Sequence, residues 1–130
     1  MQQILIIDDD EQIRALICAI LERAGFGVIE AANGEEGLKL HRARRPDLVI
    51  TDIIMPDKEG VETIIELRRE SPELPLIAIS GGGRQSSQDY LALALKLGAR
   101  RTLSKPFSRG EILEAVRDLL GSGPQTAPSK

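Results

Sequence analysis

The sequence predicts an α/β fold in which helices cover both faces of a parallel sheet. Short apolar runs alternate five times with longer segments whose apolar residues recur at helical spacing. The run at 4–7 is apolar throughout, as expected for a strand that is buried on both faces. Strands that alternate with helices in this way favour a parallel sheet with right-handed crossovers.

The expected strands and helices can be placed along the chain from their apolar spacing. Strands are expected at 4–7, 27–31, 47–52, 76–80 and 100–104. Helices, marked by apolar residues three and four positions apart, are expected between Asp10 and Gly25, at 34–45, 59–70 and 86–97, and from Ser108 to Leu120. Each expected strand is therefore followed by one helix.

Polar residues at the expected helix starts support these positions. Asp10 stands where a carboxylate caps the first backbone N–H groups of a helix. Asn33 with Glu36 resembles a capping box, in which two side chains satisfy each other's backbone N–H groups. Ser108 with Glu111 has the same spacing. These residues are expected to fix where three of the helices begin.

The composition is that of one soluble globular domain. The chain has 130 residues, of which 42% are hydrophobic and 28% charged, and its formal net charge is -3. A negative net charge argues against direct nucleic-acid binding, and no apolar stretch is long enough to span a membrane. The N-terminus lacks a signal-peptide pattern and Cys18 is the only cysteine, which together favour the cytoplasm.

The last ten residues differ in composition from the rest of the chain. Residues 121–130 (GSGPQTAPSK) are small, polar and Pro-containing, so they cannot bury much apolar area. We expect one domain over residues 1–120 and a flexible tail or linker over 121–130. The domain either stands alone or was cut from a longer chain at this linker.

Charged residues follow three of the expected strands. Asp8 and Asp9 follow the first strand, Asp52 ends the third, and Lys105 follows the fifth. The carboxyl ends of parallel strands are where open α/β sheets bind ligands, so these side chains are expected to share one cleft. Crowded carboxylates repel one another unless a cation neutralises them, and Mg²⁺ prefers such oxygen ligands. Ser80 ends the fourth strand, where its hydroxyl could donate to a phosphoryl oxygen.

Four motifs in register resemble the receiver domain of two-component response regulators. They are IIDDD, TDIIMPD followed by Gly60, the strand end Ser80-Gly81, and SKPF. Their order and spacing match over about residues 1–120. The resemblance implies a flavodoxin-like three-layer (βα)5 fold, with a five-stranded parallel sheet in the order 2-1-3-4-5.

The resemblance implies a phosphoacceptor and a set of metal ligands. Asp52 matches the phosphoacceptor, which is also a metal ligand. Asp9 matches the direct metal ligand and Asp8 its partner, which often acts through water. The backbone carbonyl of Ile54 matches the remaining protein ligand. The implied metal is Mg²⁺, with Mn²⁺ as an alternative.

The resemblance also implies a lysine and a switch. Lys105 matches the lysine that offsets phosphoryl charge, and its bond to Pro106 is expected to be cis. Ser80 matches the switch hydroxyl that moves toward the phosphoryl group. The family often carries an aromatic switch partner on the fifth strand, where this chain has Thr102. The usual coupling to an inward-turning ring therefore cannot operate here.

The expected helix at 86–97 has little polar surface. A helix that is apolar all round is usually buried on more than one side. In receiver domains the fourth helix, fifth strand and fifth helix commonly meet a partner. We therefore expect Tyr90, Leu93 or Leu97 to contribute to a homodimer or an effector contact.

The leading functional prediction is a phosphoacceptor switch. Its implied partner is a sensor histidine kinase or a phosphotransfer protein, and the chain would act only on its own phosphoryl group, not as an enzyme. An aspartate-nucleophile Mg²⁺-dependent phosphatase is one alternative, although such enzymes usually carry an acid two residues after the nucleophile, where this chain has Ile54. A docking module with vestigial phosphorylation is the other alternative.

Two further reactive side chains are expected to have structural roles. His41 lies among apolar residues of the second helix, and neither a metal site nor a phosphodonor role is assigned to it. Cys18 is interpreted as a small residue of the first helix.

Overall fold

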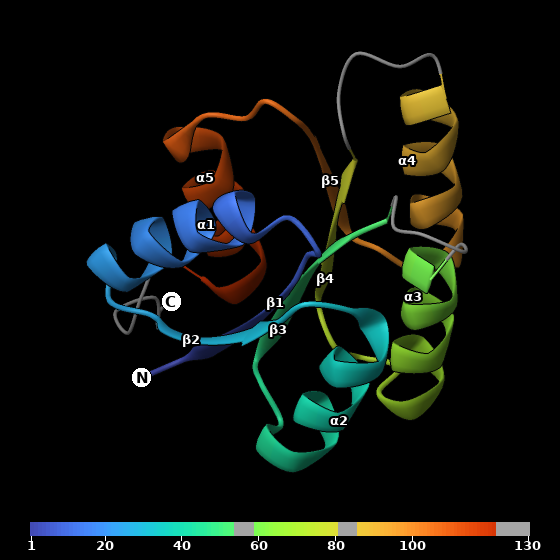
Figure 1. The fold of residues 1–130 in the computed structure, drawn as a ribbon, viewed down its shortest axis with the longest axis horizontal. Helices are drawn as coiled ribbons and strands as arrows, with labels where there is room; N and C mark the ends of the chain where they lie inside the picture. Colours follow the sequence, from blue (N-terminus) through green and yellow to red (C-terminus); the bar gives the residue numbers. More distant parts are fainter. Residues whose placement is uncertain (54–58, 81–85, 122–130) are drawn as a thin grey trace.

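A computed structural model of the chain describes residues 1–53, 59–80 and 86–121 (Figure 1). Its strands are β1 (Gln3–Ile7), β2 (Gly27–Ala31), β3 (Leu48–Asp52), β4 (Leu76–Ser80) and β5 (Arg101–Ser104). Its helices are α1 (Glu11–Arg23), α2 (Gly34–Arg44), α3 (Glu59–Glu70), α4 (Ser86–Leu97) and α5 (Arg109–Leu120). All strand pairs are parallel and the sheet order is β2-β1-β3-β4-β5, so the predicted flavodoxin-like fold is confirmed.

The sheet lies between two helical layers. In Figure 1, α1 and α5 cover one face, and α2, α3 and α4 cover the other. Successive side chains of β1 alternate between the layers: Ile4 and Ile6 join the apolar cluster under α1 and α5, whereas Leu5 and Ile7 join the other cluster. This double burial explains why the strands read as continuous apolar runs.

The helix caps explain where three helices begin. The Asp10 carboxylate accepts hydrogen bonds from the backbone N–H groups of the first turn of α1, as predicted. Ser108 and Glu111 form the predicted capping box of α5. At α2 the box is displaced, because the Glu36 carboxylate accepts from the backbone N–H of Ala32 and not from that of Asn33.

Several element ends differ from the prediction by one residue. The strand β3 begins at Leu48, and the side chain of the preceding Asp47 accepts a hydrogen bond from the backbone N–H of Gln3. The helix α2 ends at Arg44, since Arg45 takes a left-handed conformation with φ of 49°. The residue before a proline is disfavoured in the helical region, which accounts for this end.

The described part of the chain leaves some of the apolar surface of α4 uncovered, so the chain itself does not provide all the burial expected for an apolar helix. Over residues 92–97, whose side chains the structure describes, Ala94 is fully buried but Leu93 and Leu95 are 37% and 51% exposed. The helix therefore presents a partly apolar outer face. In the described ranges no helix has the length and apolar character that a membrane span requires.

Candidate functional site

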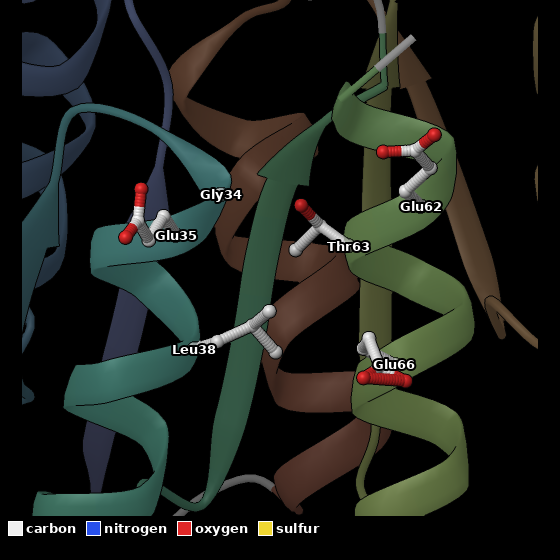
Figure 2. Close-up of a pocket in the computed structure, with 6 residues that line it drawn as sticks. All are labelled: Gly34, Glu35, Leu38, Glu62, Thr63 and Glu66. Atoms are coloured by element: carbon white, nitrogen blue, oxygen red, sulfur yellow. The ribbon is translucent and has the colours of Figure 1, made fainter.

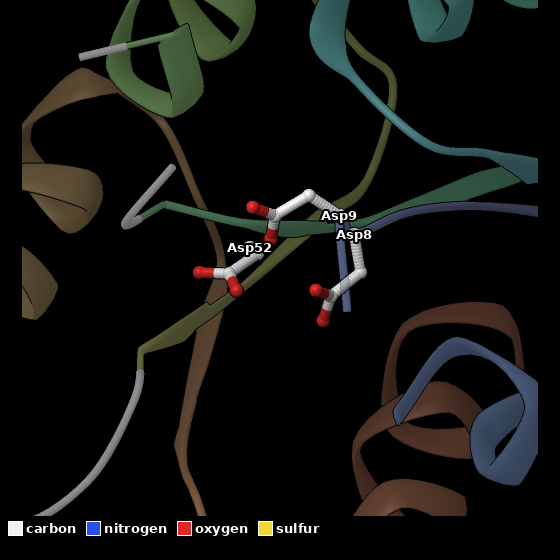
Figure 3. Close-up of side chains that lie close together, drawn as sticks. All are labelled: Asp8, Asp9 and Asp52. Atoms are coloured by element: carbon white, nitrogen blue, oxygen red, sulfur yellow. The ribbon is translucent and has the colours of Figure 1, made fainter. Parts of the chain in front are cut away.

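Three carboxylates meet at the carboxyl edge of the sheet. Asp8 and Asp9 follow β1, and Asp52 is the last residue of β3, the neighbour of β1 in the sheet. Figure 3 shows the three side chains pointing to the same side of the strand ends. One carboxylate oxygen from each residue lies within 4.8 Å of the other two. The predicted convergence of the acids from two strands is therefore observed.

Lys105 provides a cation directly beside these acids. Its Nζ lies 3.0 Å from Asp52 Oδ2 and 3.3 Å from Asp8 Oδ2. Burial opposes the charge on this ammonium, but the hydrogen bond to Asp52, its charge and that of Asp8 outweigh the burial and raise the pKa of Lys105. The ammonium is therefore charged at neutral pH.

The acidic cluster fits a hard divalent cation. Asp8 is 1% exposed, and its Oδ1 accepts a hydrogen bond from the backbone N–H of Asp10. Its buried Oδ2 accepts no hydrogen bond of good geometry from any residue that the structure describes, although the Lys105 Nζ lies 3.3 Å away. A buried carboxylate oxygen with lone pairs to spare, close to two further carboxylates, suits Mg²⁺. The expected metal ligand Ile54 lies outside the described residues.

Ser80 and Thr102 lie on the two strands beside the cluster. Ser80 is fully buried at the carboxyl end of β4, and its backbone carbonyl accepts a hydrogen bond from the N–H of Lys105 at 2.8 Å. The bond from Lys105 to Pro106 is cis, as predicted. Thr102 pairs with Ala78 on β4 and is partly exposed. A backbone hydrogen bond thus holds Ser80 beside Lys105, whereas Thr102 lies farther from the strand ends.

The predicted partner residues of α4 lie in different surroundings. Leu93 is exposed, whereas Leu97 packs against the buried cluster under α2, α3 and α4. The backbone of Tyr90 belongs to α4, but its side chain is outside what the structure describes. Of these three, Leu93 is the one with a described exposed side chain.

Arg14 contacts the acidic turn, and the sequence analysis did not single it out. Its Nη1 donates to the backbone carbonyl of Asp8 at 2.7 Å, and its Nε donates to Glu30 Oε1 at 3.0 Å. A signal was present, because Arg14 is in the first turn of α1, where the helix dipole disfavours a cation. A basic residue at such a place indicates a specific contact that compensates.

Cys18 is buried in α1 and does not belong to the site. Burial, and next the neighbouring Glu30 carboxylate, raise the pKa of the thiol to about 12. The thiol is therefore protonated at neutral pH and is a poor nucleophile.

Away from the acidic cluster, a hollow lies between α2 and α3 (Figure 2). Leu38 from α2 and Thr63 from α3 point into this space, which has a volume of about 240 Å³. Its lining residues are Gly34, Glu35, Leu38, Glu62, Thr63 and Glu66. Within the described residues, only Asp8, Asp9 and Asp52 bring together three side chains that could share a metal ion. The strand-end cluster is therefore the candidate site.

Comparison with known sequences gives the same assignment along most of the chain. Residues 4–117 match the family described as the response regulator receiver domain. The chain is 34% identical over 128 residues to the alkaline phosphatase synthesis transcriptional regulatory protein PhoP of Bacillus subtilis, covering 98% of this chain and 52% of that protein. It is 36% identical over 120 residues to the transcriptional regulatory protein CpxR of Escherichia coli, covering 92% and 50%. The chain thus spans about half the length of these curated relatives.

Solved structures agree with the sequence comparison. The receiver domain of NtrX from Brucella abortus superimposes with a TM-score of 0.85 at 29% identity, covering 92% of this chain and 99% of that one. A response regulator receiver domain protein from Methanospirillum hungatei gives a TM-score of 0.83 at 30% identity, covering 92% and 94%. On the family match, the identities and the shared fold, the chain belongs to the response regulator receiver domain family.

Proposed function

We propose that this chain is a phosphoacceptor switch that takes a phosphoryl group onto Asp52 in a Mg²⁺-dependent reaction. The donor is a phosphohistidine of a sensor histidine kinase or of a phosphotransfer protein, and the chain receives the group in the cytoplasm. The observation that carries the proposal is the surroundings of Asp52. Its nearly buried side chain lies 3.0 Å from the Lys105 ammonium and within 4.8 Å of the two other carboxylates.

The reaction is an in-line displacement at phosphorus. A carboxylate oxygen of Asp52 forms the new P–O bond as the P–N bond to the donor imidazole breaks, and the imidazole leaves with the electron pair of that bond. Lys105 holds Asp52 in place and donates to an equatorial phosphoryl oxygen. Asp8, Asp9 and Asp52 would hold the metal, with the carbonyl of Ile54 as the further ligand. The bound Mg²⁺ would offset the charge on the phosphoryl oxygens.

Ser80 would report the phosphoryl group to the surface. An acyl phosphate adds a charge of about -1.5 to -2 at neutral pH. The Ser80 hydroxyl, at the end of β4, would donate to a phosphoryl oxygen and so favour one arrangement of this edge over another. With Thr102 in place of an aromatic residue, the signal would reach the surface made by α4, β5 and α5 without a ring rotation. Leu93, together with Tyr90 and Leu97, is the proposed contact for a second copy or an effector.

The direct test is phosphorylation by a small-molecule donor. The purified chain would be incubated with Mg²⁺ and acetyl phosphate, and its intact mass would be measured. We expect a labile gain of one phosphoryl group, which Asp52→Asn abolishes. Asp47→Asn is the matched control, because this aspartate lies at the opposite end of β3 and its side chain contacts Gln3; this variant should still gain the group.

Two other results would change the assignment. No mass gain with acetyl phosphate, phosphoramidate or a phosphohistidine donor would leave a docking module as the better description. Continuous release of phosphate from an excess of an aryl phosphate, dependent on Asp52, would favour the phosphatase. A single labile phosphoryl group without such turnover fits a switch that acts only on itself.

A further inference from the structure

The guanidinium of Arg14 connects the acidic turn to a different strand. Nη1 donates to the backbone carbonyl of Asp8 at 2.7 Å, while Nε donates to Glu30 Oε1 on β2 at 3.0 Å. The Arg14 side chain is 15% exposed and that of Glu30 is 49% exposed. The planar guanidinium spreads its donors in a fixed fork, so two acceptors hold it in one orientation. Glu30 thus aims Arg14 at the turn.

The carbonyl that Arg14 contacts lies between two of the proposed metal ligands. The Asp8 carbonyl and the Asp9 N–H belong to one rigid peptide plane, so a bond to this carbonyl restrains how both residues leave the backbone. The backbone N–H of Asp8 donates to the Ala31 carbonyl at 3.1 Å, and Asp8 Oδ1 accepts from Asp10. Arg14 therefore adds a restraint on the peptide that joins Asp8 to Asp9.

Orientation of the turn by Arg14 would strengthen metal binding, whereas the positive charge of Arg14 would by itself weaken it. A cation close to a metal site repels the metal, and the half-exposed Glu30 carboxylate only partly offsets the charge of Arg14. Removing Arg14 would therefore tighten metal binding if through-space charge were its main effect. It would weaken metal binding if orientation of the turn were its main effect. The sign of the change distinguishes the two.

We propose that Arg14 is a positioning residue for the metal site, and that it orients the Asp8–Asp9 turn through the carbonyl of Asp8. Glu30 contributes to this positioning because it holds the Arg14 guanidinium. This inference rests on the proposed function, since it requires a divalent cation at the three carboxylates. Groups that orient metal ligands from outside the first coordination sphere typically change metal affinity by about 10- to 100-fold when they are removed.

The test is a Mg²⁺ titration of the full chain without a phosphoryl donor. Binding is measured by calorimetry and by backbone amide NMR. Arg14→Ala should raise the Kd for Mg²⁺ by about tenfold or more. Arg14→Lys keeps the charge but loses the fork, so it should recover only part of the affinity. Arg101→Ala is the matched control: Arg101 also pairs with a carboxylate, Asp118, at 2.8 Å, but on β5 and α5, and its loss should leave the Kd unchanged.

The melting temperature of each variant separates positioning from general stability. An Arg14→Ala protein that melts earlier but, when folded, binds Mg²⁺ as the wild type does would overturn the inference. So would tighter binding by this variant, or wild-type affinity in Arg14→Lys. If Arg14→Ala does not fold, Arg14→Lys and Glu30→Gln decide by the same readout. A wild-type chain that binds no Mg²⁺ would instead overturn the proposed function, and this inference with it.

Discussion

His41 is enclosed where the carboxyl ends of α2 and α3 meet. It is 3% exposed, its Nε2 lies 3.1 Å from Ser71 Oγ, and its Nδ1 lies 3.7 Å from Glu70 Oε1. Burial lowers the pKa of the imidazole; the Glu70 charge opposes this shift, and the cations of Arg45 and Arg42 add to it. The imidazole is therefore neutral in the folded chain at neutral pH, in line with the structural role predicted for it.

This lowered pKa predicts how stability depends on pH. The unfolded chain protonates His41 near the ordinary value of 6.5, whereas the folded chain does so only at lower pH. The stability that His41 contributes is therefore fully present above 6.5 and falls as the pH is lowered through the window between the two pKa values. Urea unfolding at about pH 7.5 and about pH 5.5 should show a smaller advantage of the wild type over His41→Gln at the lower pH.

The comparison with His41→Gln removes the contribution of other titrating groups, because both proteins contain them. The Glu70 carboxylate is one of these groups, and the hydrogen bond from Arg42 lowers its pKa below the usual 4.5, outside the window tested. An advantage of the wild type that is the same at both pH values would contradict a neutral, buried imidazole.

The start of α3 is packed against the strand that carries Asp52. A Cβ atom added to Gly60 would lie 2.3 Å from the backbone carbonyl oxygen of Ile53, the residue after Asp52. This approach is possible only without a side chain at position 60, since backbone atoms cannot move aside as a flexible side chain can. Gly60 therefore sets the distance between α3 and the site.

Gly60→Ala should consequently destabilise the chain although alanine is the better helix former. Forcing atoms into such a contact typically costs about 1–3 kcal/mol, more than the roughly 1 kcal/mol that alanine gains over glycine inside a helix. Gly110→Ala in the first turn of α5 is the control, because its Cβ would meet only Ser108 Oγ, at 3.8 Å. Chemical unfolding should show a loss for Gly60→Ala and no loss for Gly110→Ala. Equal effects of the two substitutions would contradict the packing argument.

For the helices and strands as units, the sequence predicted each one that the structure describes, because apolar periodicity records which faces are buried. It placed element ends less well, since an end depends on single residues, such as the left-handed Arg45. The sequence also predicted an apolar α4 that is buried on more than one side; within residues 92–97 the described chain alone does not cover it, and the contact predicted to cover it stays a prediction. Apolar composition shows that a helix could be buried, whereas the number of neighbouring elements decides whether it is; Leu95 is 51% exposed.

Across the whole molecule, the candidate site could be predicted because topology alone brings strand ends together. Asp8, Asp52 and Lys105 are far apart in sequence, yet each follows or ends a strand of one parallel sheet. Arg14 could not be predicted in the same way. Its proposed role depends on the reach of a long side chain from α1 and on Glu30, a β2 residue outside the motifs found in the sequence.

The same convergence of charge sets function against stability. Three carboxylates face one ammonium, so the edge of the sheet carries excess negative charge when no cation is bound. Lys105 pairs with Asp8 and Asp52, whereas Asp9 is exposed and makes no hydrogen bond or ion pair with the part of the chain that the structure describes. Asp9 therefore adds repulsion without a compensating contact inside the described fold.

Asp9→Asn should accordingly have opposite effects with and without Mg²⁺. Without metal it should raise the free energy of unfolding by roughly 0.5–2 kcal/mol, as a substitution that relieves strain at a functional site commonly does. Mg²⁺ at 100 times its Kd should stabilise the wild type by about 2.7 kcal/mol and the variant much less, because a ligand stabilises only as far as it binds the folded state.

Glu114→Gln is the control for this prediction. It neutralises an exposed carboxylate on α5 and should alter neither the stability without metal nor the stabilisation by Mg²⁺. Urea unfolding in EDTA and in Mg²⁺ measures both free energies. An Asp9→Asn variant that is less stable than the wild type in EDTA, or that gains as much stability from Mg²⁺, would contradict the argument that Asp9 repels its neighbours and binds the metal.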